Sequence, residues 1–207
     1  MAVLQSPAEP HRFVTAMPSW SNIARHAHIL VVFASAPLFA AEQKTFTSDG
    51  YGYRLRYPKA WNVSESGSGV PLFSNYSPSE AGPQGLFPSG GAEIYLIPFA
   101  AVKATTSATT LKEWIQSNSG RDHSKVAVRS VPRPAGARGG PQNAFEVKSD
   151  FERDPQDETL QREINYYFDL HGAGFRLMLL YWKGDSRALY FESVLRSVFR
   201  SITALGP

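Results

Sequence analysis

The stretch Tyr51-Gly52-Tyr53-Arg54-Leu55-Arg56-Tyr57-Pro58-Lys59-Ala60-Trp61 decides how the folded part of this 207-residue chain begins. Apolar and charged residues alternate in it with a period of two, which is typical of a half-buried strand. The positions expected to face the core are Tyr53, Leu55 and Tyr57, and those expected to face solvent are Arg54 and Arg56. Pro58 has no N–H group to donate and ends the pairing, while Trp61 buries a large ring where the chain reverses.

Residues 1–41, which precede this stretch, have the pattern of an export leader. A predominantly apolar run of eleven residues, Ile29–Phe39, follows the basic Arg25 and leads into Ala40 and Ala41. A positive flank, about 7–15 apolar residues and small residues at the exit are typical of a secretory signal. The run is also shorter than the roughly 20 residues that a membrane-spanning helix needs. We therefore expect a cleaved leader and a bacterial protein located in the periplasm or secreted.

Two alternatives to this leader stay open. The apolar run could be a buried core helix, although Pro37 suits a helix interior poorly. Residues 1–16 are unlike a compact positive leader, so the true start could be Met17. In either form of the leader, we expect the mature protein to begin near Glu42 and to keep no stable membrane anchor.

The composition of residues 42–207 excludes several classes of protein. These 166 residues suffice for one domain with a real core, and we expect a monomer. The chain has no cysteine, which excludes a disulfide framework, a thiol nucleophile and a thiolate metal site. The leader removes Arg12, Arg25 and Glu9, so the formal charge falls from +3 to +2. A nearly neutral domain is not an electrostatic binder of nucleic acid.

The rest of the sequence alternates short apolar runs with turn residues. Residues 45–207 therefore predict one α+β domain with an antiparallel sheet and two inserted helices. One helix is expected after Thr110, with Glu113 completing a capping box, and another from about Arg187. The expected strands are Thr45–Thr47, Tyr53–Tyr57, Trp61–Val63, Val70–Ser74, Ala92–Phe99, Ser124–Val131, Ala144–Phe151, Arg162–Leu170, Phe175–Trp182 and a short one near Ser201.

With this layout the chain resembles the PsbP-like family of small exported α+β domains. The resemblance rests on Tyr51-Gly52-Tyr53, on Tyr57-Pro58-x-x-Trp61 and on the closing helix through Leu195–Phe199, and it covers roughly Thr45–Thr203. It implies an antiparallel sheet with helices packed on both faces, an α/β/α sandwich. Family members in photosynthetic organisms are accessory proteins of the water-splitting photosystem, and many bacterial relatives are exported domains without an established activity. No functional residue of the family can be transferred to this chain.

The segment Ser64–Gly91 is too long for an ordinary connection. Of its 28 residues, 17 are Ser, Gly or Pro, yet it also holds Leu72, Phe73, Tyr76, Leu86 and Phe87. Exposed together, such side chains would form a contact patch of a kind that monomers rarely leave unused. We therefore take Phe73, Tyr76 and Phe87 as candidate binding residues for a partner protein or an apolar ligand. If they are buried, they only extend the core.

Three patterns resemble enzyme sites, and each has a plainer interpretation. Gly184-Asp185-Ser186 is similar to the nucleophile block of the GDS-type esterases, but no histidine follows it, and Asp185 or Ser186 is expected to cap a helix. After the leader only His123 and His171 remain, too few for the usual catalytic zinc site. The third pattern is the acidic run Asp150, Glu152, Asp154, Asp157 and Glu158. It lacks the Gly and Glu of a calcium loop and predicts a solvated hairpin tip.

The turn with Arg129, Arg133 and Arg138 could bind an acidic partner or lipid headgroups, although a solvated loop is the default. It has no interleaved aromatic residues for stacking bases. From the sequence we expect an exported, non-catalytic accessory or binding domain that needs no cofactor or metal and whose partner is unknown. A carrier of small apolar ligands or lipids is one alternative, and a hydrolase using Ser186 is another.

Overall fold

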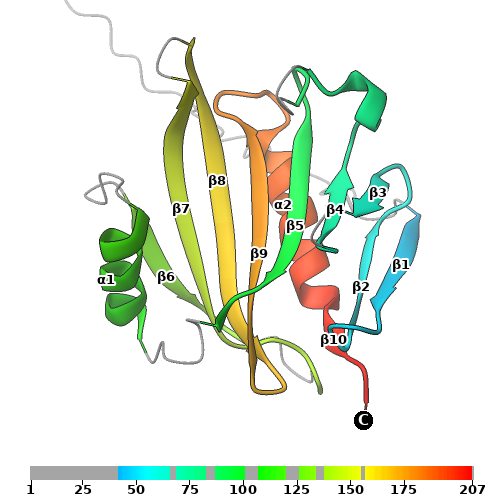
Figure 1. The fold of residues 1–207 in the computed structure, drawn as a ribbon, viewed down its shortest axis with the longest axis vertical. Helices are drawn as coiled ribbons and strands as arrows, with labels where there is room; N and C mark the ends of the chain where they lie inside the picture. Colours follow the sequence, from blue (N-terminus) through cyan, green and yellow to red (C-terminus); the bar gives the residue numbers. More distant parts are fainter. Residues whose placement is uncertain are drawn as a thin grey trace, which may run out of the picture. The chain divides into compact units, whose positions relative to one another are not determined.

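The computed structural model of the chain describes residues 42–65, 69–82, 87–100, 107–119, 126–133, 138–154 and 157–206. The expected leader, its cleavage site and the alternative start at Met17 lie outside these residues, as do His123 and Leu86. The described residues form an α+β structure in which every strand pairing is antiparallel (Figure 1). None of its helices is long and apolar enough to cross a membrane.

The strands form two sheets rather than the single sheet expected from the sequence. The larger sheet has the order β3-β4-β5-β9-β8-β7-β6 and the smaller one the order β1-β2-β10. The strands are β1 (Gln43–Ser48), β2 (Tyr53–Pro58), β3 (Asn62–Glu65), β4 (Pro71–Ser74), β5 (Ala92–Pro98), β6 (Ala127–Val131), β7 (Gln142–Asp154), β8 (Asp157–Leu170), β9 (Ala173–Trp182) and β10 (Thr203–Ala204). The chain leaves the small sheet at the β2–β3 turn, so the expected single sheet is divided at Pro58–Trp61.

The opening strand has the alternation that its sequence predicts. Tyr53, Leu55 and Tyr57 of β2 are buried, while Arg54 and Arg56 are exposed. The buried residues join one core cluster with the large sheet and with α2 (Ala188–Ser201). Trp61 belongs to the same cluster, as expected. The small sheet therefore contributes its apolar face to the main core of the protein.

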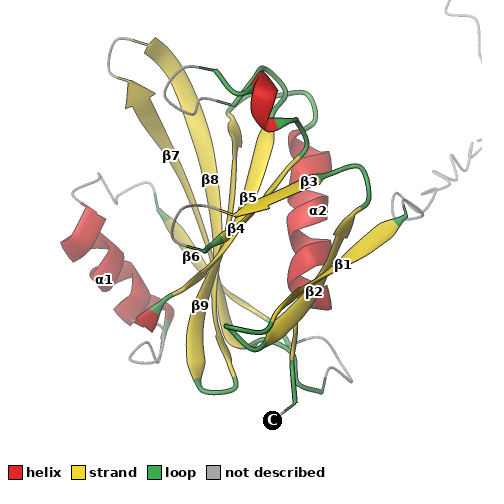
Figure 2. Ribbon diagram, turned by 45° about the vertical axis from the view of Figure 1, so that its right-hand side comes forward, coloured by secondary structure: helices red, strands yellow, loops and turns green. Residues whose placement is uncertain are grey.

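The two helices cover opposite faces of the large sheet, as the PsbP-like resemblance implies. Alternate residues of a strand face opposite sides. On β8, Tyr166 and Phe168 contact Phe199 of α2, whereas Tyr167 packs in a second cluster with Leu111 and Ile115 of α1 (Ala108–Ser119). Figure 2 shows α1 and α2 on either side of the sheet.

Helix α2 has the apolar spacing of a helix packed on one side. Its buried residues are Phe191, Val194, Leu195, Val198 and Phe199. They recur at the i, i+3, i+4 spacing of a single helical stripe. This stripe packs against the large sheet and also against β2 of the small sheet. Helix α2 is thus the element that the two sheets share (Figure 1).

Both expected helix caps are displaced along the chain. Helix α1 starts before Thr110, and the Ser107 hydroxyl accepts a hydrogen bond of 3.2 Å from the Thr110 N–H group. Thr110 is therefore a helical residue and not the cap. At α2 the N-cap position is Arg187, whose N–H group donates to Asp185 Oδ1 at 2.7 Å. No side chain caps the N-terminus of α2, so the expected cap at Asp185 or Ser186 is wrong, and Ser186 is exposed.

The β7–β8 and β8–β9 hairpins have longer strands and shorter turns than the sequence predicts. Strands β7 and β8 extend to Asp154 and Asp157, so the acidic run lies within the two paired strands and not in a loop between them. Antiparallel pairing with the facing strand favours extension over a loop here. The β8–β9 hairpin turns on His171 and Gly172, with φ angles of 50° and 74°. These positive values are those of a type I′ turn.

The segment from Ser64 to Gly91 folds back into the structure. It contributes β4, which pairs with both β3 and β5, and a short 3-10 helix at Pro78–Glu80. Asn75 ties the middle of the segment to its C-terminal end: Asn75 Nδ2 donates to Gly90 O at 2.9 Å, and Asn75 Oδ1 accepts from Ala92 N at 2.7 Å. Described parts of this segment are therefore tied to the sheet.

Candidate functional site

The three candidate residues of the Ser64–Gly91 segment are buried and do not form an exposed patch. Phe73 of β4 lies in the main core, in contact with Phe46 and Tyr57. The Tyr76 hydroxyl donates to the buried carboxylate of Glu93. Turn-forming neighbours suggested a surface loop, but the large rings of the segment gain more free energy from burial than from exposure.

Phe87, the third candidate, packs against Trp182 with the two rings tilted by 50°. The ring centroids are 4.9 Å apart, and Trp182 Nε1 donates to Phe87 O at 3.2 Å. Only 2% of Phe87 is exposed. The expected contact patch is therefore corrected to a part of the core, and the apolar-ligand carrier loses the observation that favoured it.

Among the described residues, the only histidine lies far from Ser186, the nucleophile of the hydrolase alternative. Ser186 follows the end of β9, whereas His171 precedes its start. A strand of ten residues at about 3.4 Å per residue separates them by about 30 Å. Within the described ranges, no group of three His, Asp or Glu side chains could hold a metal ion.

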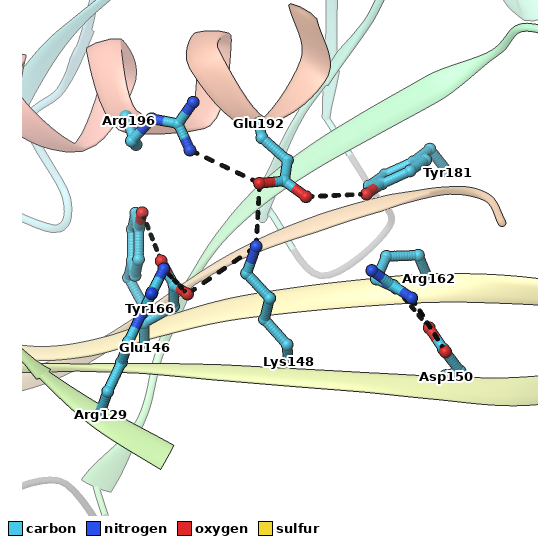
Figure 3. Close-up of polar contacts among 9 residues, drawn as sticks. All are labelled: Arg129, Glu146, Lys148, Asp150, Arg162, Tyr166, Tyr181, Glu192 and Arg196. Carbon is cyan, nitrogen blue, oxygen red and sulfur yellow. Dashed lines mark hydrogen bonds and ion pairs between the residues drawn. The ribbon is translucent and has the colours of Figure 1, made fainter. Parts of the chain in front are cut away.

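A different set of side chains comes together between the large sheet and α2 (Figure 3). We call it the charged cluster. Strand β7 supplies three of its members at alternate positions, facing α2, and the register brings residues of β8 and β9 next to them. The charged cluster consists of Arg129, Glu146, Lys148, Asp150, Arg162, Lys183, Glu192 and Arg196.

Glu146 is the buried carboxylate of the charged cluster, with 4% of the residue exposed. Arg129 Nη2 lies 2.5 Å from Glu146 Oε1, and Lys148 Nζ lies 4.0 Å from the same oxygen. The Tyr166 hydroxyl donates to Glu146 Oε2 at 3.0 Å. Burial raises the pKa of Tyr166, and the Glu146 carboxylate raises it further. Tyr166 therefore stays protonated and remains a donor.

Lys148 links the Glu146 carboxylate of β7 to Glu192 of helix α2. Its Nζ donates to Glu192 Oε2 at 2.8 Å, and Arg196 lies 3.5 Å from the same carboxylate, one helical turn further on. The Tyr181 hydroxyl donates to Glu192 Oε1 at 3.1 Å. Burial alone would raise the pKa of Glu192, but Lys148, the Tyr181 hydroxyl and Arg196 together outweigh it and lower the pKa. Glu192 is thus held ionised between strand and helix.

Asp150 forms the third acceptor, at the end of the charged cluster near the β7–β8 hairpin. It accepts from Arg162 Nη2 at 3.0 Å and lies 2.9 Å from Lys183 Nζ. Burial would raise the pKa of Asp150, but the hydrogen bonds from Arg162 and Lys183 lower it overall. The hydrogen bond to Asp150 raises the pKa of Arg162.

The charged cluster carries more positive than negative charge. It contains five cationic and three anionic side chains, so its net charge is +2. The formal charge of residues 42–207 is also +2. The side chains of Glu146, Glu192 and Asp150 are 5%, 15% and 30% exposed, whereas those of Arg129, Lys183 and Arg196 are 66%, 43% and 41% exposed. The arrangement presents cations to solvent above acceptors that hold them in place.

Sequence reasoning found only part of this site. It named Arg129 in a basic turn, but Arg129 lies on β6 and pairs with Glu146, while Arg133 and Arg138 lie outside the charged cluster. It missed Glu146 and Lys148. A usable signal was present, because Phe145 and Val147 alternate with them, which predicts one apolar and one charged face.

We expect the Glu192→Gln variant to lose part of the pH dependence of folding stability. A carboxylate with a lowered pKa stabilises the folded state fully above its ordinary value of 4.5, and the contribution is lost as the pH falls through the lowered value. Unfolding in urea between pH 7 and pH 3 should therefore show a shallower decline for Glu192→Gln than for the wild type. Glu113→Gln, on the exposed side of α1, serves as the control. Parallel curves for all three proteins would contradict the structure.

A second group of buried polar residues lies on the opposite face of the sheet. Arg176 Nη2 lies 3.0 Å from Glu163 Oε1, and Arg176 Nε donates to Asn165 Oδ1 at 2.7 Å. Asn165 Nδ2 in turn donates to Glu163 Oε1 at 2.6 Å. The Arg176 guanidinium also lies over the Tyr167 ring, 5.9 Å from its centroid. These contacts join β8 and β9 by an ion pair between the buried Glu163 and the half-buried Arg176.

No family model matches the sequence, and no curated protein matches it. Among solved structures, a protein of Bacteroides thetaiotaomicron VPI-5482 is 18% identical over 79% of this chain, with a TM-score of 0.45. The chain spans about half of that protein, 48% of its length. LpqN of Mycobacterium tuberculosis, described as involved in cell envelope biogenesis, is 13% identical with a TM-score of 0.44, and the match covers 80% of this chain and 91% of LpqN.

The PsbP-like proteins that the sequence resembles are also among the structural matches. PsbP of the cyanobacterium Synechocystis sp. PCC 6803 is 11% identical to this chain, with a TM-score of 0.35. The match covers 84% of this chain and 98% of that protein.

Proposed function

We propose that this protein is an exported, non-catalytic accessory domain that binds an acidic surface of another exported protein through the charged cluster. The observation that carries the proposal is the excess of cations over carboxylates, with Arg129, Lys183 and Arg196 at the exposed side. Complementary charge gives an interface its specificity and its rate of association. The leader pattern in residues 1–41 supports export.

The preorganisation of the charged cluster suits this role. Each exposed cation contacts a carboxylate that is more deeply buried than itself, so its position is held before a partner arrives. Rigid side chains lose less conformational entropy on binding than free ones. An acidic partner can therefore approach guanidinium groups that are already oriented.

The test is chemical cross-linking of the tagged full chain in its native host, with partners identified from the exported fraction. The triple variant Arg129→Gln/Lys183→Gln/Arg196→Gln should reduce capture of an acidic partner at least tenfold. The control Lys44→Gln/Lys59→Gln/Lys112→Gln removes three exposed cations elsewhere and so has the same net charge. It should capture like the wild type. Captured protein should begin near Glu42.

Three outcomes would refute the proposal. The first is equal loss of capture by both triple variants, which would indicate a nonspecific charge effect. The second is capture that does not weaken when salt is raised from 50 to 300 mM, because exposed charge pairs are screened over that range. The third is recovery of the protein from the cytosol with Met1 or Met17 intact, which would end the export interpretation.

A further inference from the structure

Strand β1 has one open edge, and we infer that this edge pairs with β1 of a second copy of the chain to form a two-fold dimer. In the order β1-β2-β10, β1 is the outermost strand of the small sheet (Figure 1). None of the described residues pairs with its outer edge. The inference does not depend on the proposed partner, because no residue of β1 belongs to the charged cluster.

Strand β1 is the longest of the four edge strands. It has six residues, whereas β6 has five, β3 has four and β10 has two. Open edges are usually protected by short strands, proline, bulges or charged side chains. Strand β1 has no proline, pairs with β2 without a shift of register, and carries Lys44 as its only charge. The monomer expected from the sequence did not take this edge into account, because composition does not show which edges a fold leaves open.

The hydrogen bonds of the small sheet show which backbone groups of β1 face outward. Lys59 N donates to Glu42 O at 2.8 Å, and the register places these two residues opposite each other. Glu42 and Lys59 are therefore a hydrogen-bonded pair of the antiparallel ladder. Such pairs alternate with pairs whose backbone groups point away from each other. The N–H and C=O groups that face the open edge are consequently those of Gln43, Thr45 and Thr47.

The other edge of β2 follows the same alternation. Arg56 lies opposite Thr45. The Arg56 N–H group donates to Ser201 Oγ at 2.8 Å, and the Ser201 hydroxyl lies 3.2 Å from Arg56 O. Ser201 ends α2 and leads into β10, so the backbone groups of Arg56 point away from β1. Those of Thr45 point away from β2 in the same way, and they have no partner among the described residues.

A two-fold axis at Thr45 gives the register with the most backbone pairing. Gln43 then lies opposite Thr47 of the second copy, and Thr45 lies opposite its own equivalent. Each of these pairs exchanges two N–H···O bonds, so every outward-facing backbone group of β1 has a partner. An axis at Lys44 or Phe46 would leave one of the three residues without a partner in β1. Two-fold symmetry is also the commonest symmetry of homo-oligomers.

The side chains of β1 fit this register. Lys44 lies opposite Phe46 of the second copy and not opposite another lysine, so the pairing needs no charge from Lys44. The two Thr45 side chains meet on the outer face, a cross-strand pair that is favourable. On the inner face, the Phe46 ring packs edge-on against Phe73, with a centroid distance of 5.4 Å. Strand β1 is thus anchored to the core before it pairs, which reduces the entropy lost on association.

The test is cross-linking of single-cysteine variants of the full chain, which has no cysteine of its own. In the inferred register the two Thr45 Cα atoms are about 5.5 Å apart, within the range of a disulfide. With oxidised glutathione, Thr45→Cys should form a disulfide-linked dimer at least tenfold faster than Thr47→Cys. The matched control, Thr47→Cys, replaces another exposed threonine on the same face of β1. Its two copies would be about 14 Å apart along the strands.

A proline variant tests the backbone pairing separately. Thr45→Pro removes an N–H group that β2 does not use, and proline is tolerated at such edge positions. One strand pair is a small interface, so sedimentation equilibrium of the wild type should show a reversible dimer. Thr45→Pro should raise the Kd of this dimer at least tenfold. Thr45→Val keeps the N–H group and the branched side chain and should dimerise like the wild type.

Each other result would overturn the inference. Equal rates of cross-linking for Thr45→Cys and Thr47→Cys would indicate random collision. A wild type that is monomeric at every concentration would show that the edge does not pair with a second copy. A dimer that Thr45→Pro does not weaken would place the interface elsewhere on the molecule. Circular dichroism shows whether each variant is folded, and if Thr45→Pro is not, the cross-linking rates decide.

Discussion

Replacement of Trp61 with alanine should lower the free energy of unfolding by about 3–5 kcal/mol, the usual cost of truncating a large aromatic residue in a core. Only 3% of Trp61 is exposed. Its backbone N–H group donates to Pro58 O at 2.9 Å, which places Trp61 in the turn that leads from the small sheet into the large one. The Trp61→Ala variant removes packing at this junction and leaves a cavity.

Urea denaturation followed by circular dichroism measures the effect of Trp61→Ala. Leu189→Ala is the control, because Leu189 is an apolar residue with 80% of its surface exposed. Its effect should be within about 0.5 kcal/mol of zero, as for other surface substitutions. A loss below about 1 kcal/mol for Trp61→Ala would place this ring at the surface.

Arg176→Met should cost about 3–5 kcal/mol, the range observed when one partner of a buried ion pair is removed. The variant deprives the buried Glu163 of its guanidinium and Asn165 of its donor from Arg176. The second replacement, Glu163→Gln, removes the carboxylate charge but keeps an oxygen to accept from Asn165 Nδ2. The double variant Arg176→Met/Glu163→Gln should therefore regain most of the lost stability.

The free energies of unfolding of the wild type, both single variants and the double variant form a double-mutant cycle. We expect the double variant to be more stable than the sum of the single effects predicts, because the buried uncompensated charge is gone. Additive losses would mean that Arg176 contributes only packing, through its contact with Tyr167. Such a result would rule out the ion pair as the source of stability.

Local patterns in the sequence predicted the strands well, because the burial of alternate side chains in a strand appears directly as alternation of apolar and polar residues. The alternation in β2 and the apolar runs of β5 and β9 each required only neighbouring residues. The PsbP-like order of elements followed from the same runs. The division into two sheets was missed, because no local pattern says that β2 pairs with β10 instead of joining β3 and β4.

The contacts of the charged cluster also could not be predicted from local sequence patterns. Lys148 and Glu192 are 44 residues apart in sequence, and their contact depends on the register of β7 and on the rotation of α2. Neither can be read from either segment alone. The burial of Phe73 and Phe87 also depends on distant partners, since Phe87 meets Trp182 only after the large sheet has formed. Turn-forming residues around them indicated a loop without showing where its rings point.

The pairing of β2 with β10 sets an order of events during synthesis. Arg54 of β2 donates its Nε hydrogen to Thr203 Oγ1, and 149 positions separate the two residues. Strand β5 likewise cannot pair with β9 until β9 has been made, which happens only after α1 and three further strands. Until then both strands have open edges, and contacts between distant segments form slowly because the closing loop is long. During synthesis, one edge of β5 therefore stays unpaired until β9 is made, and one edge of β2 stays unpaired until β10 is made after the last helix.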